Sequence, residues 1–178
     1  KAVSGAMGGS KSEEFLAPCE TGEDTYVLCP KCGFAANVEA MVTKVAAADA
    51  SEVPAMEELD TPNTPTIDSL VAILNEKFGG GFTGAATLKN VMLMADNKAI
   101  SVLVPGDREV DLKRLQAGLV GVEELRTFEE DDFAKFPTLV KGYIGPQDAA
   151  KSGITVYADP RVAPGTSWVT GANKLNRH

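Results

Sequence analysis

Apolar residues recur at helical spacing in the stretch TPTIDSLVAILNEKFGGG, residues 64–81. Thr64 is placed to cap a helix, and Pro65 suits the first turn, where no backbone N–H is needed. The glycines at 79–81 end the pattern. The spacing predicts an amphipathic helix that buries one face, composed of Ile67, Leu70, Val71, Leu74 and Phe78.

Two apolar runs after this helix are predicted as the central strands of a sheet. TLKNVMLMA (87–95) and AISVLV (99–104) are apolar at nearly every position, which indicates burial on both faces of a hairpin turning at 96–98. Shorter strands are expected at 24–29, 122–128, 154–162 and 167–173, with helices at 37–48, 108–119 (capped by Asp107), 129–136 and within 141–153. Because these elements lack a strict β-α-β rhythm, we predict an α+β fold, a mixed, largely antiparallel curved sheet flanked by helices.

Composition narrows the possible functions. The 178 residues carry a net charge of −8, which speaks against a free-standing nucleic-acid-binding protein, because such binding depends on basic surface. No apolar stretch reaches the roughly 20 residues that cross a bilayer, so no membrane partner is expected. The odd number of cysteines and the lack of a signal peptide favour a reducing, cytoplasmic location.

The pair Cys29 and Cys32 has the spacing of half a zinc site. A structural zinc ion usually needs a second pair of thiolate or imidazole ligands, and the sequence offers only Cys19 and the distant His178. We therefore predict no metal and interpret CPKCG as a strand end and turn. A Cys3His zinc site remains the alternative.

Common catalytic signatures are missing from the sequence, which contains no GxSxG, no phosphate-binding GKS/T loop and no HExxH. The remaining candidates are Lys89 within an apolar strand, the loop GYIGP (142–146), Asp159 at a strand end and the segment GANKLNRH (171–178). Each alone has a structural explanation, since a lysine at a strand entrance usually extends to solvent and a GxxGP loop is usually a turn.

Taken together and in order, these motifs resemble a known family. The stretches are GAMGGSKSEEF, GEDTYVLCPKCGFAANVE, DTPNTPTIDSL, TLKNVMLM, GYIGP, DPRV and GANKLNRH. They are similar to the insertion (editing) domain of bacterial-type prolyl-tRNA synthetases, among the YbaK-like aminoacyl-tRNA deacylases. The resemblance implies that residues 1–15 are a remnant of the class II catalytic core or its connection. Residues 16–178 would be the editing domain, truncated at its C-terminal end. Glu13 and Phe34 depart from the family's usual histidine and tyrosine.

The family implies hydrolysis of the ester in Ala-tRNA(Pro), without a cofactor. Its partners would be the alanine-bearing 3′ CCA end of tRNA(Pro) and the rest of the prolyl-tRNA synthetase. A pocket shaped for proline cannot exclude the smaller alanine, because a missing methylene forfeits only about 1–3 kcal/mol. A second, smaller site is therefore expected to accept alanine and exclude proline. The alternative is a non-catalytic module that only binds the acceptor end.

The resemblance also implies residue roles. Thr61, Ile67 and Leu70 are expected to shape the pocket, and His178 to stand at its mouth. Lys89 is expected to meet the phosphate backbone of the CCA end and position the ester.

The remaining expected roles belong to a loop and one acid. Asp159 is expected to hold the ammonium group of alanine. The glycine-rich loop is expected to bind the ester oxyanion through its backbone N–H groups. That loop comprises Gly142, Tyr143, Ile144, Gly145 and Pro146.

Overall fold

The chain falls into two compact units, Lys1–Lys44 and Val45–His178. The computed structural model describes residues 13, 15–22, 24–38, 41, 44–45, 53–162 and 165–178. Nearly all of the predicted connection at 1–15 and much of the predicted helix at 37–48 lie outside the described residues. The boundary predicted between residues 15 and 16 stays a prediction.

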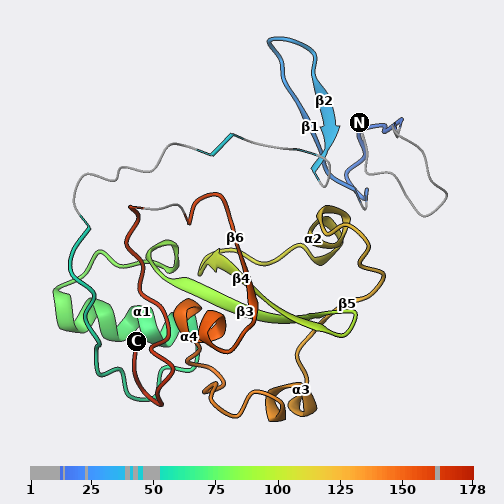
Figure 1. Cartoon of the computed structure of the whole chain (residues 1–178). Coiled ribbons are helices and arrows are strands. Elements are labelled where there is room, and N and C mark those ends of the chain that lie inside the picture. The colour runs from blue at the N-terminus through green and yellow to red at the C-terminus, as the bar shows by residue number, and fades with distance from the viewer. Residues whose placement is uncertain are drawn as a thin grey trace. The chain divides into compact units, whose positions relative to one another are not determined.

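The first unit contains a short antiparallel hairpin, labelled β1 and β2 in Figure 1. Its strands are β1 (Tyr26–Leu28) and β2 (Ala35–Asn37). The Cys29 carbonyl accepts the Gly33 N–H at 3.0 Å and closes the turn, while Gly33 adopts the left-handed conformation at φ 70°. The strand expected at 24–29 is confirmed, and Cys29 and Cys32 lie in the turn.

The second unit is built on a four-stranded sheet in the order β5-β3-β4-β6 (Figure 1). The strands are β3 (Leu88–Ala95), β4 (Lys98–Pro105), β5 (Leu125–Thr127) and β6 (Thr155–Ala158). β3 pairs antiparallel with β4 and β5, and β4 pairs parallel with β6. The predicted mixed, largely antiparallel sheet is confirmed.

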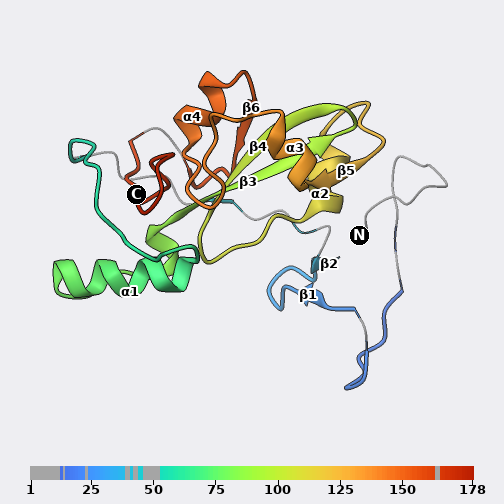
Figure 2. The ribbon, with the colours of Figure 1, turned by 90° about the horizontal axis from the view of Figure 1, so that it is seen from below.

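Helices cover both faces of this sheet, which explains why its central strands are apolar at nearly every position. On one face, Met92 packs with Ala149 of α4 (Pro146–Lys151) and Phe133 of α3 (Glu130–Ala134). On the other face, Leu93 and Val102 pack with Leu115 of α2 (Leu112–Gly118). In Figure 1, α4 and α3 lie below β3 and α2 lies above it, and Figure 2 shows the same elements turned by 90°.

The helix predicted at 64–81 is α1 (Ile67–Phe78), but its cap was placed wrongly. Thr66 is the N-cap, and its hydroxyl accepts the Ser69 N–H at 3.2 Å. Thr64 is buried and donates its hydroxyl to the Thr61 carbonyl at 2.6 Å, so it is already engaged outside the helix. Pro65 therefore precedes the cap instead of standing in the first turn.

Three further expectations differ from the structure. Phe78 ends α1 with 52% of its surface exposed, beside Phe82, instead of packing in the core. Asp111, not Asp107, caps α2, because its carboxylate accepts the Arg114 N–H at 3.0 Å. The run at 167–173 forms no strand and pairs only through an isolated bridge between Thr87 and Val169.

In the described part of the chain, no helix is both long and apolar enough to cross a membrane.

Candidate functional site

A cavity of about 480 Å³ opens in the second unit beside the start of β3. The N-terminal turn of α1, the strand β3, the loop after Val140 and the C-terminal segment all contribute to its wall. Six of the predicted site residues line it, namely Ile67, Leu70, Lys89, Gly142, Ile144 and His178. Another hollow, at the β3–β4 turn, is lined by none of the predicted residues. The first cavity is therefore the candidate site.

Part of the apolar wall comes from the first turn of α1. Ile67 and Leu70 both face the cavity, as expected for residues three apart on a helix. Leu70 is nevertheless only 2% exposed and belongs to the buried core. Its side chain therefore serves both the packing of α1 and the shape of the cavity.

His178 reaches the cavity because its backbone is paired with the segment before α1. The Leu59 N–H donates to the His178 carbonyl at 2.7 Å, and the His178 N–H donates to the Leu59 carbonyl at 3.2 Å. The imidazole Nδ1 lies 2.7 Å from the Thr61 hydroxyl, and the ring lies 5.3 Å from that of Tyr143. Among the described residues, none bonds to Nε2, so Nε2 is left to meet a ligand.

Burial lowers the pKa of His178 below its ordinary value. The imidazole is therefore neutral near pH 7, and each ring nitrogen can act as donor or acceptor according to the tautomer. Thr61 and Tyr143 do not line the cavity themselves. They contact the His178 ring, Thr61 through its hydroxyl and Tyr143 through its ring, and so they support the position of His178.

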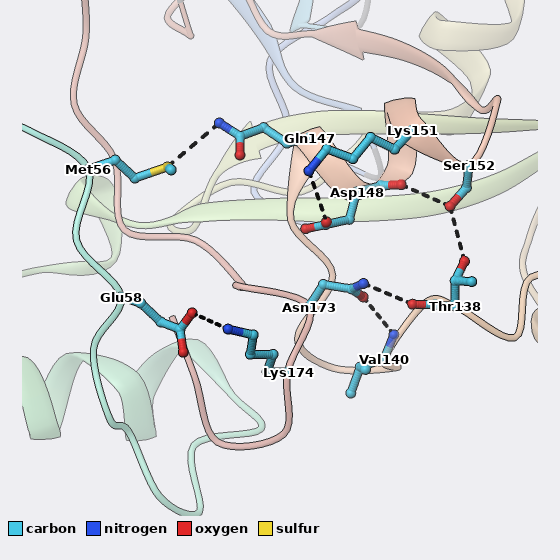
Figure 3. Close-up of polar contacts among 10 residues, drawn as sticks. All are labelled: Met56, Glu58, Thr138, Val140, Gln147, Asp148, Lys151, Ser152, Asn173 and Lys174. Carbon is cyan, nitrogen blue, oxygen red and sulfur yellow. Dashed lines mark hydrogen bonds and ion pairs between the residues drawn. The ribbon is translucent and has the colours of Figure 1, made fainter.

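The C-terminal segment is held against the glycine-rich loop by Asn173. Its side chain accepts the Val140 N–H at 2.8 Å and donates to the Thr138 carbonyl at 2.8 Å, as Figure 3 shows. Its backbone N–H donates to the Tyr143 carbonyl at 2.6 Å. One asparagine thus satisfies three backbone groups, one in the glycine-rich loop and two just before it.

Asn176 makes a second connection, between the same loop and the segment before α1. Its side-chain oxygen accepts the Asn63 N–H at 3.0 Å and the Tyr143 hydroxyl at 3.1 Å. Its carbonyl accepts the Thr61 N–H at 2.9 Å. Glu58 adds an ion pair to Lys174 at 2.6 Å, also drawn in Figure 3.

Two glycines allow this close packing. A Cβ atom added to Gly145 would lie 2.3 Å from the Gly171 carbonyl oxygen, and one added to Gly171 would lie 2.3 Å from the Tyr143 carbonyl. Neither contact is possible for a real side chain. The loop and the C-terminal segment therefore touch backbone to backbone.

Few backbone N–H groups of the loop are available to a ligand. The Tyr143 N–H already donates to the Val140 carbonyl at 2.9 Å, so it is not available to a ligand. Gly142, at φ 86°, and Ile144 line the cavity, and their N–H groups bond to no other described residue. Gly145 is the N-cap of α4 and Pro146 its first residue, and neither lines the cavity.

Lys89 places a cation at the cavity wall. Its Nζ lies 2.5 Å from Oε1 of Glu109, whose side chain is 88% exposed. An ion pair with so exposed a partner contributes little, because water and salt screen it and the glutamate loses side-chain entropy. A phosphate group could therefore replace Glu109 at modest cost.

Asp159 is not brought to this cavity. Its carboxylate accepts the Arg161 N–H at 2.9 Å and the Arg161 Nη1 at 3.1 Å. It lies just beyond β6, and it is not among the residues that line the cavity. Its expected contact with the substrate ammonium stays a prediction.

Several residues that line the cavity were not singled out from the sequence. Phe133 and Phe128 form one side, with ring centroids 5.2 Å apart in an edge-to-face arrangement. Gly171 and Asn90 are also in the wall. Asn90 had a recognisable signal, because it is a polar residue within the apolar run of β3.

A buried carboxylate anchors the helix that supplies Phe133. Asp132 is 2% exposed and accepts hydrogen bonds from Arg126 at 2.5 and 3.2 Å, from Lys135 at 3.1 Å and from the Glu129 N–H at 3.0 Å. The Arg126 guanidinium, followed by the Glu129 N–H, holds the pKa of Asp132 well below its usual range. The charged form of Asp132 is therefore part of the folded structure.

In the described part of the chain, no three histidine, cysteine or acidic side chains gather in a way that could hold a metal ion. Cys29 and Cys32 are free thiols in the hairpin of the first unit. The pKa of Cys29 is lowered by hydrogen bonds from the Cys32 and Lys31 backbone. Among the described residues, no third metal ligand lies close to Cys29 and Cys32.

Comparison with known proteins identifies the class of this fold and cavity. Residues 61–178 match the family described as the aminoacyl-tRNA editing domain. The proline–tRNA ligase of Streptomyces coelicolor is 51% identical over 178 residues, and proline–tRNA ligase 1 of Streptomyces avermitilis is 55% identical over 178 residues. The proline–tRNA ligase of Mycobacterium tuberculosis H37Rv is 50% identical over 186 residues.

These alignments cover 99% of this chain and 30 to 31% of each ligase. The chain belongs to the aminoacyl-tRNA editing domain family, as the insertion editing domain found in bacterial-type prolyl-tRNA synthetases. It spans about 30% of the length of the curated relatives it matches.

Gly171→Ala should destabilise the second unit, because its Cβ would meet the Tyr143 carbonyl. Overpacking of this kind costs about 1–3 kcal/mol in free energy of unfolding, measurable by urea denaturation. Gly118→Ala is the matched control. Gly118 ends α2 and has open space around it, so alanine there should be neutral or stabilising by up to about 1 kcal/mol. Equal stability of the two variants would contradict the close contact.

Asp132→Asn should lower stability at neutral pH, and the loss should shrink in acid. The folded pKa of Asp132 lies below its unfolded value of about 3.9, so its contribution is present above that pH and is lost as pH falls through the folded pKa. Urea denaturation at several pH values measures the difference from the unmodified chain. Asp131→Asn removes the same charge from an exposed neighbour and should show no comparable pH dependence.

Proposed function

We propose that this domain hydrolyses the ester that joins alanine to tRNA(Pro), and so removes a misacylated product of prolyl-tRNA synthetase. Family membership and the identity to proline–tRNA ligases support an editing role. The observation that carries the finer proposal is the apolar wall of Ile67 and Leu70 beside Lys89, Gly142 and His178 in one cavity.

The volume of the cavity bears on how the site can distinguish alanine from proline. A volume of about 480 Å³ exceeds what a methyl group needs, and it lies within the roughly 300–1,000 Å³ typical of small-molecule sites. The aminoacyl group and the terminal nucleoside can therefore enter together. Exclusion of proline must then come locally, from the close wall that Ile67 and Leu70 present to the amino acid side chain.

The residues in the wall suggest how the ester is held. Lys89 would bind a phosphate of the CCA end in place of Glu109 and orient the acceptor. The N–H groups of Gly142 and Ile144 would face the ester carbonyl, and neutral His178 would contact the substrate through Nε2. Positioning by such groups converts a bimolecular step into an effectively unimolecular one.

Hydrolysis then needs one water molecule. Water attacks the ester carbonyl carbon, the bond to the ribose oxygen breaks, and alanine and tRNA(Pro) leave. Negative charge develops on the carbonyl oxygen, where backbone donors stabilise the transition state more than the ground state. The free ribose hydroxyl of the substrate would relay the proton, since the described residues of the wall include no acidic side chain that could act as a general base.

The test compares deacylation of Ala-tRNA(Pro) and Pro-tRNA(Pro) by this chain. We expect the alanyl ester to be hydrolysed and the prolyl ester to be spared. The same comparison with a full-length proline–tRNA ligase that contains the domain covers the case in which the rest of the enzyme is needed to bind tRNA. Binding without turnover in both preparations would favour the alternative, a module that only recognises the acceptor end.

Variants at Leu70 test the wall within the same experiment. Leu70→Ala should raise the rate of prolyl ester hydrolysis about 10- to 200-fold, because hydrocarbon differences in a pocket are worth about 1–3 kcal/mol. Leu74→Ala is the control, since Leu74 is fully buried in the same helix and does not line the cavity. Each variant should lose about 2–5 kcal/mol of stability, but only Leu70→Ala should change selectivity. Unchanged selectivity would contradict the proposed wall.

Lys89→Ala should lower kcat/KM for the alanyl ester by at least about tenfold, because a hydrogen bond to a charged group is worth about 1.5–3 kcal/mol. Glu109→Gln removes only the exposed partner of Lys89, and it should leave activity unchanged or slightly raised. Steady-state deacylation measures both variants, with circular dichroism to check the fold. Retained activity in Lys89→Ala would remove the lysine from the site.

A further inference from the structure

Asn90 carries a buried amide group that is only half satisfied. Among the described residues, its Nδ2 is the buried side-chain nitrogen or oxygen atom for which the structure gives no hydrogen-bond partner. Buried polar atoms are nearly always paired in folded proteins, because an unpaired one loses its bonds to water without replacement. An orphaned donor in a native structure therefore calls for a ligand or a functional reason.

The other end of the same amide is held firmly. The Ser101 hydroxyl donates to Oδ1 of Asn90, and Ser101 is fully buried in the neighbouring strand β4. Ser101 stands opposite Met92, two residues along β3 from Asn90, so the serine and the asparagine belong to the same face of the sheet. In this arrangement the amide presents Oδ1 to Ser101, and its Nδ2 group lies on the other side of the amide.

The position of Asn90 in the strand connects this residue to the site. Asn90 lines the cavity, and its neighbours in the strand, Lys89 and Val91, line it too. The run LKNVMLMA that forms β3 is otherwise apolar apart from Lys89. Folding alone would be served as well by an apolar pair in place of Asn90 and Ser101, so the unpaired amide N–H costs stability that a contact with substrate can offset.

The chemistry of the two side chains assigns them different partners. Lys89 is a cation and suits a phosphate, whereas a neutral amide N–H suits an uncharged acceptor that gains negative charge during reaction. We propose that Asn90 donates an Nδ2–H bond to the carbonyl oxygen of the aminoacyl ester. It thereby acts as a side-chain member of the oxyanion site with the backbone N–H groups of Gly142 and Ile144. This inference rests on the proposed deacylase function.

Such a donor acts mainly in the transition state. The carbonyl oxygen becomes an oxyanion when water adds to the ester carbon, and the hydrogen bond strengthens at that moment. Loss of one such donor lowers kcat by roughly 10²–10³-fold. Substrate binding should change less, so KM should stay within a few-fold of its original value.

The test replaces both members of the buried pair by apolar residues. The double variant Asn90→Leu/Ser101→Ala removes the orphaned donor and the hydroxyl that would otherwise lose its acceptor. Replacing both partners of a buried hydrogen bond in this way can be nearly neutral for folding. We expect stability close to that of the unmodified chain, a kcat for Ala-tRNA(Pro) lowered by about a hundredfold, and a similar KM. An unchanged kcat in a folded double variant would overturn the proposal.

Two single variants keep the proposal testable if the double variant does not fold. Asn90→Asp retains an acceptor for Ser101 but removes the donor, and it should lose as much kcat as the double variant. Ser101→Ala keeps the donor but frees the amide to rotate, so kcat should fall only partly. Equal activity of Asn90→Asp and the unmodified chain would overturn the assignment.

Binding of a non-hydrolysable analogue separates this inference from the proposed function. The probe is adenosine bearing the phosphonate analogue of alanine as a 3′ ester, whose anionic tetrahedral oxygens mimic the oxyanion of the transition state. If the unmodified chain binds the probe but hydrolyses no Ala-tRNA(Pro), the proposed function fails. Weaker binding to Asn90→Asp would then still support the Asn90 contact. If the probe binds equally to both while the unmodified chain remains inactive, the Asn90 contact is overturned.

Discussion

The candidate site depends on one contact between two pieces of backbone, the loop at 142–146 and the segment at 171–178. Gly145 and Gly171 let these pieces approach more closely than any side chain would permit. Asn173 and Asn176 then satisfy the polar groups that this approach buries. The result places His178 beside Thr61, and Gly142 and Ile144 in the same wall. Without this contact, the cavity would lack one of its sides.

The cavity combines two kinds of surface that rarely meet by chance. Its apolar side is the continuation of the core, since Leu70 is both packed and lining. Its polar lining includes Lys89, Asn90 and His178. A ligand with a small apolar group next to a carbonyl and a phosphate matches this division. An amino acid esterified to the end of a nucleic acid has these features in that order.

The sequence predicted an element correctly where many neighbouring residues carried the same pattern. The periodic run of α1 and the two apolar runs of β3 and β4 gave the right elements, because burial on a helix face or on both faces of a strand leaves a repeated pattern. The cap of α1 was misplaced because two threonines flank Pro65, and the choice depends on a bond from Thr64 to Thr61 that no local pattern shows. The run at 167–173 was misjudged because its backbone pairs with the sheet at one isolated bridge, between Thr87 and Val169, and forms no ladder.

The site residues, too, were partly found from the sequence and partly missed. Motifs shared with a known family pointed to Lys89, Ile67, Leu70 and His178, which the structure brings together in one cavity. Asn90 went unnoticed, because its significance lies in what does and does not bond to its amide. Asp159 looked as suitable as the others in the sequence, but the structure engages its carboxylate with Arg161, away from the cavity wall.

The pairing of Leu59 with His178 has a consequence for how such a unit is carried by a larger protein. Leu59 and His178 are 119 positions apart in numbering and exchange both of their backbone hydrogen bonds, so the two ends of the region that matches the editing-domain family lie side by side. A region whose ends are adjacent can be accommodated within a surface turn of a longer chain without separating the flanking segments of that chain.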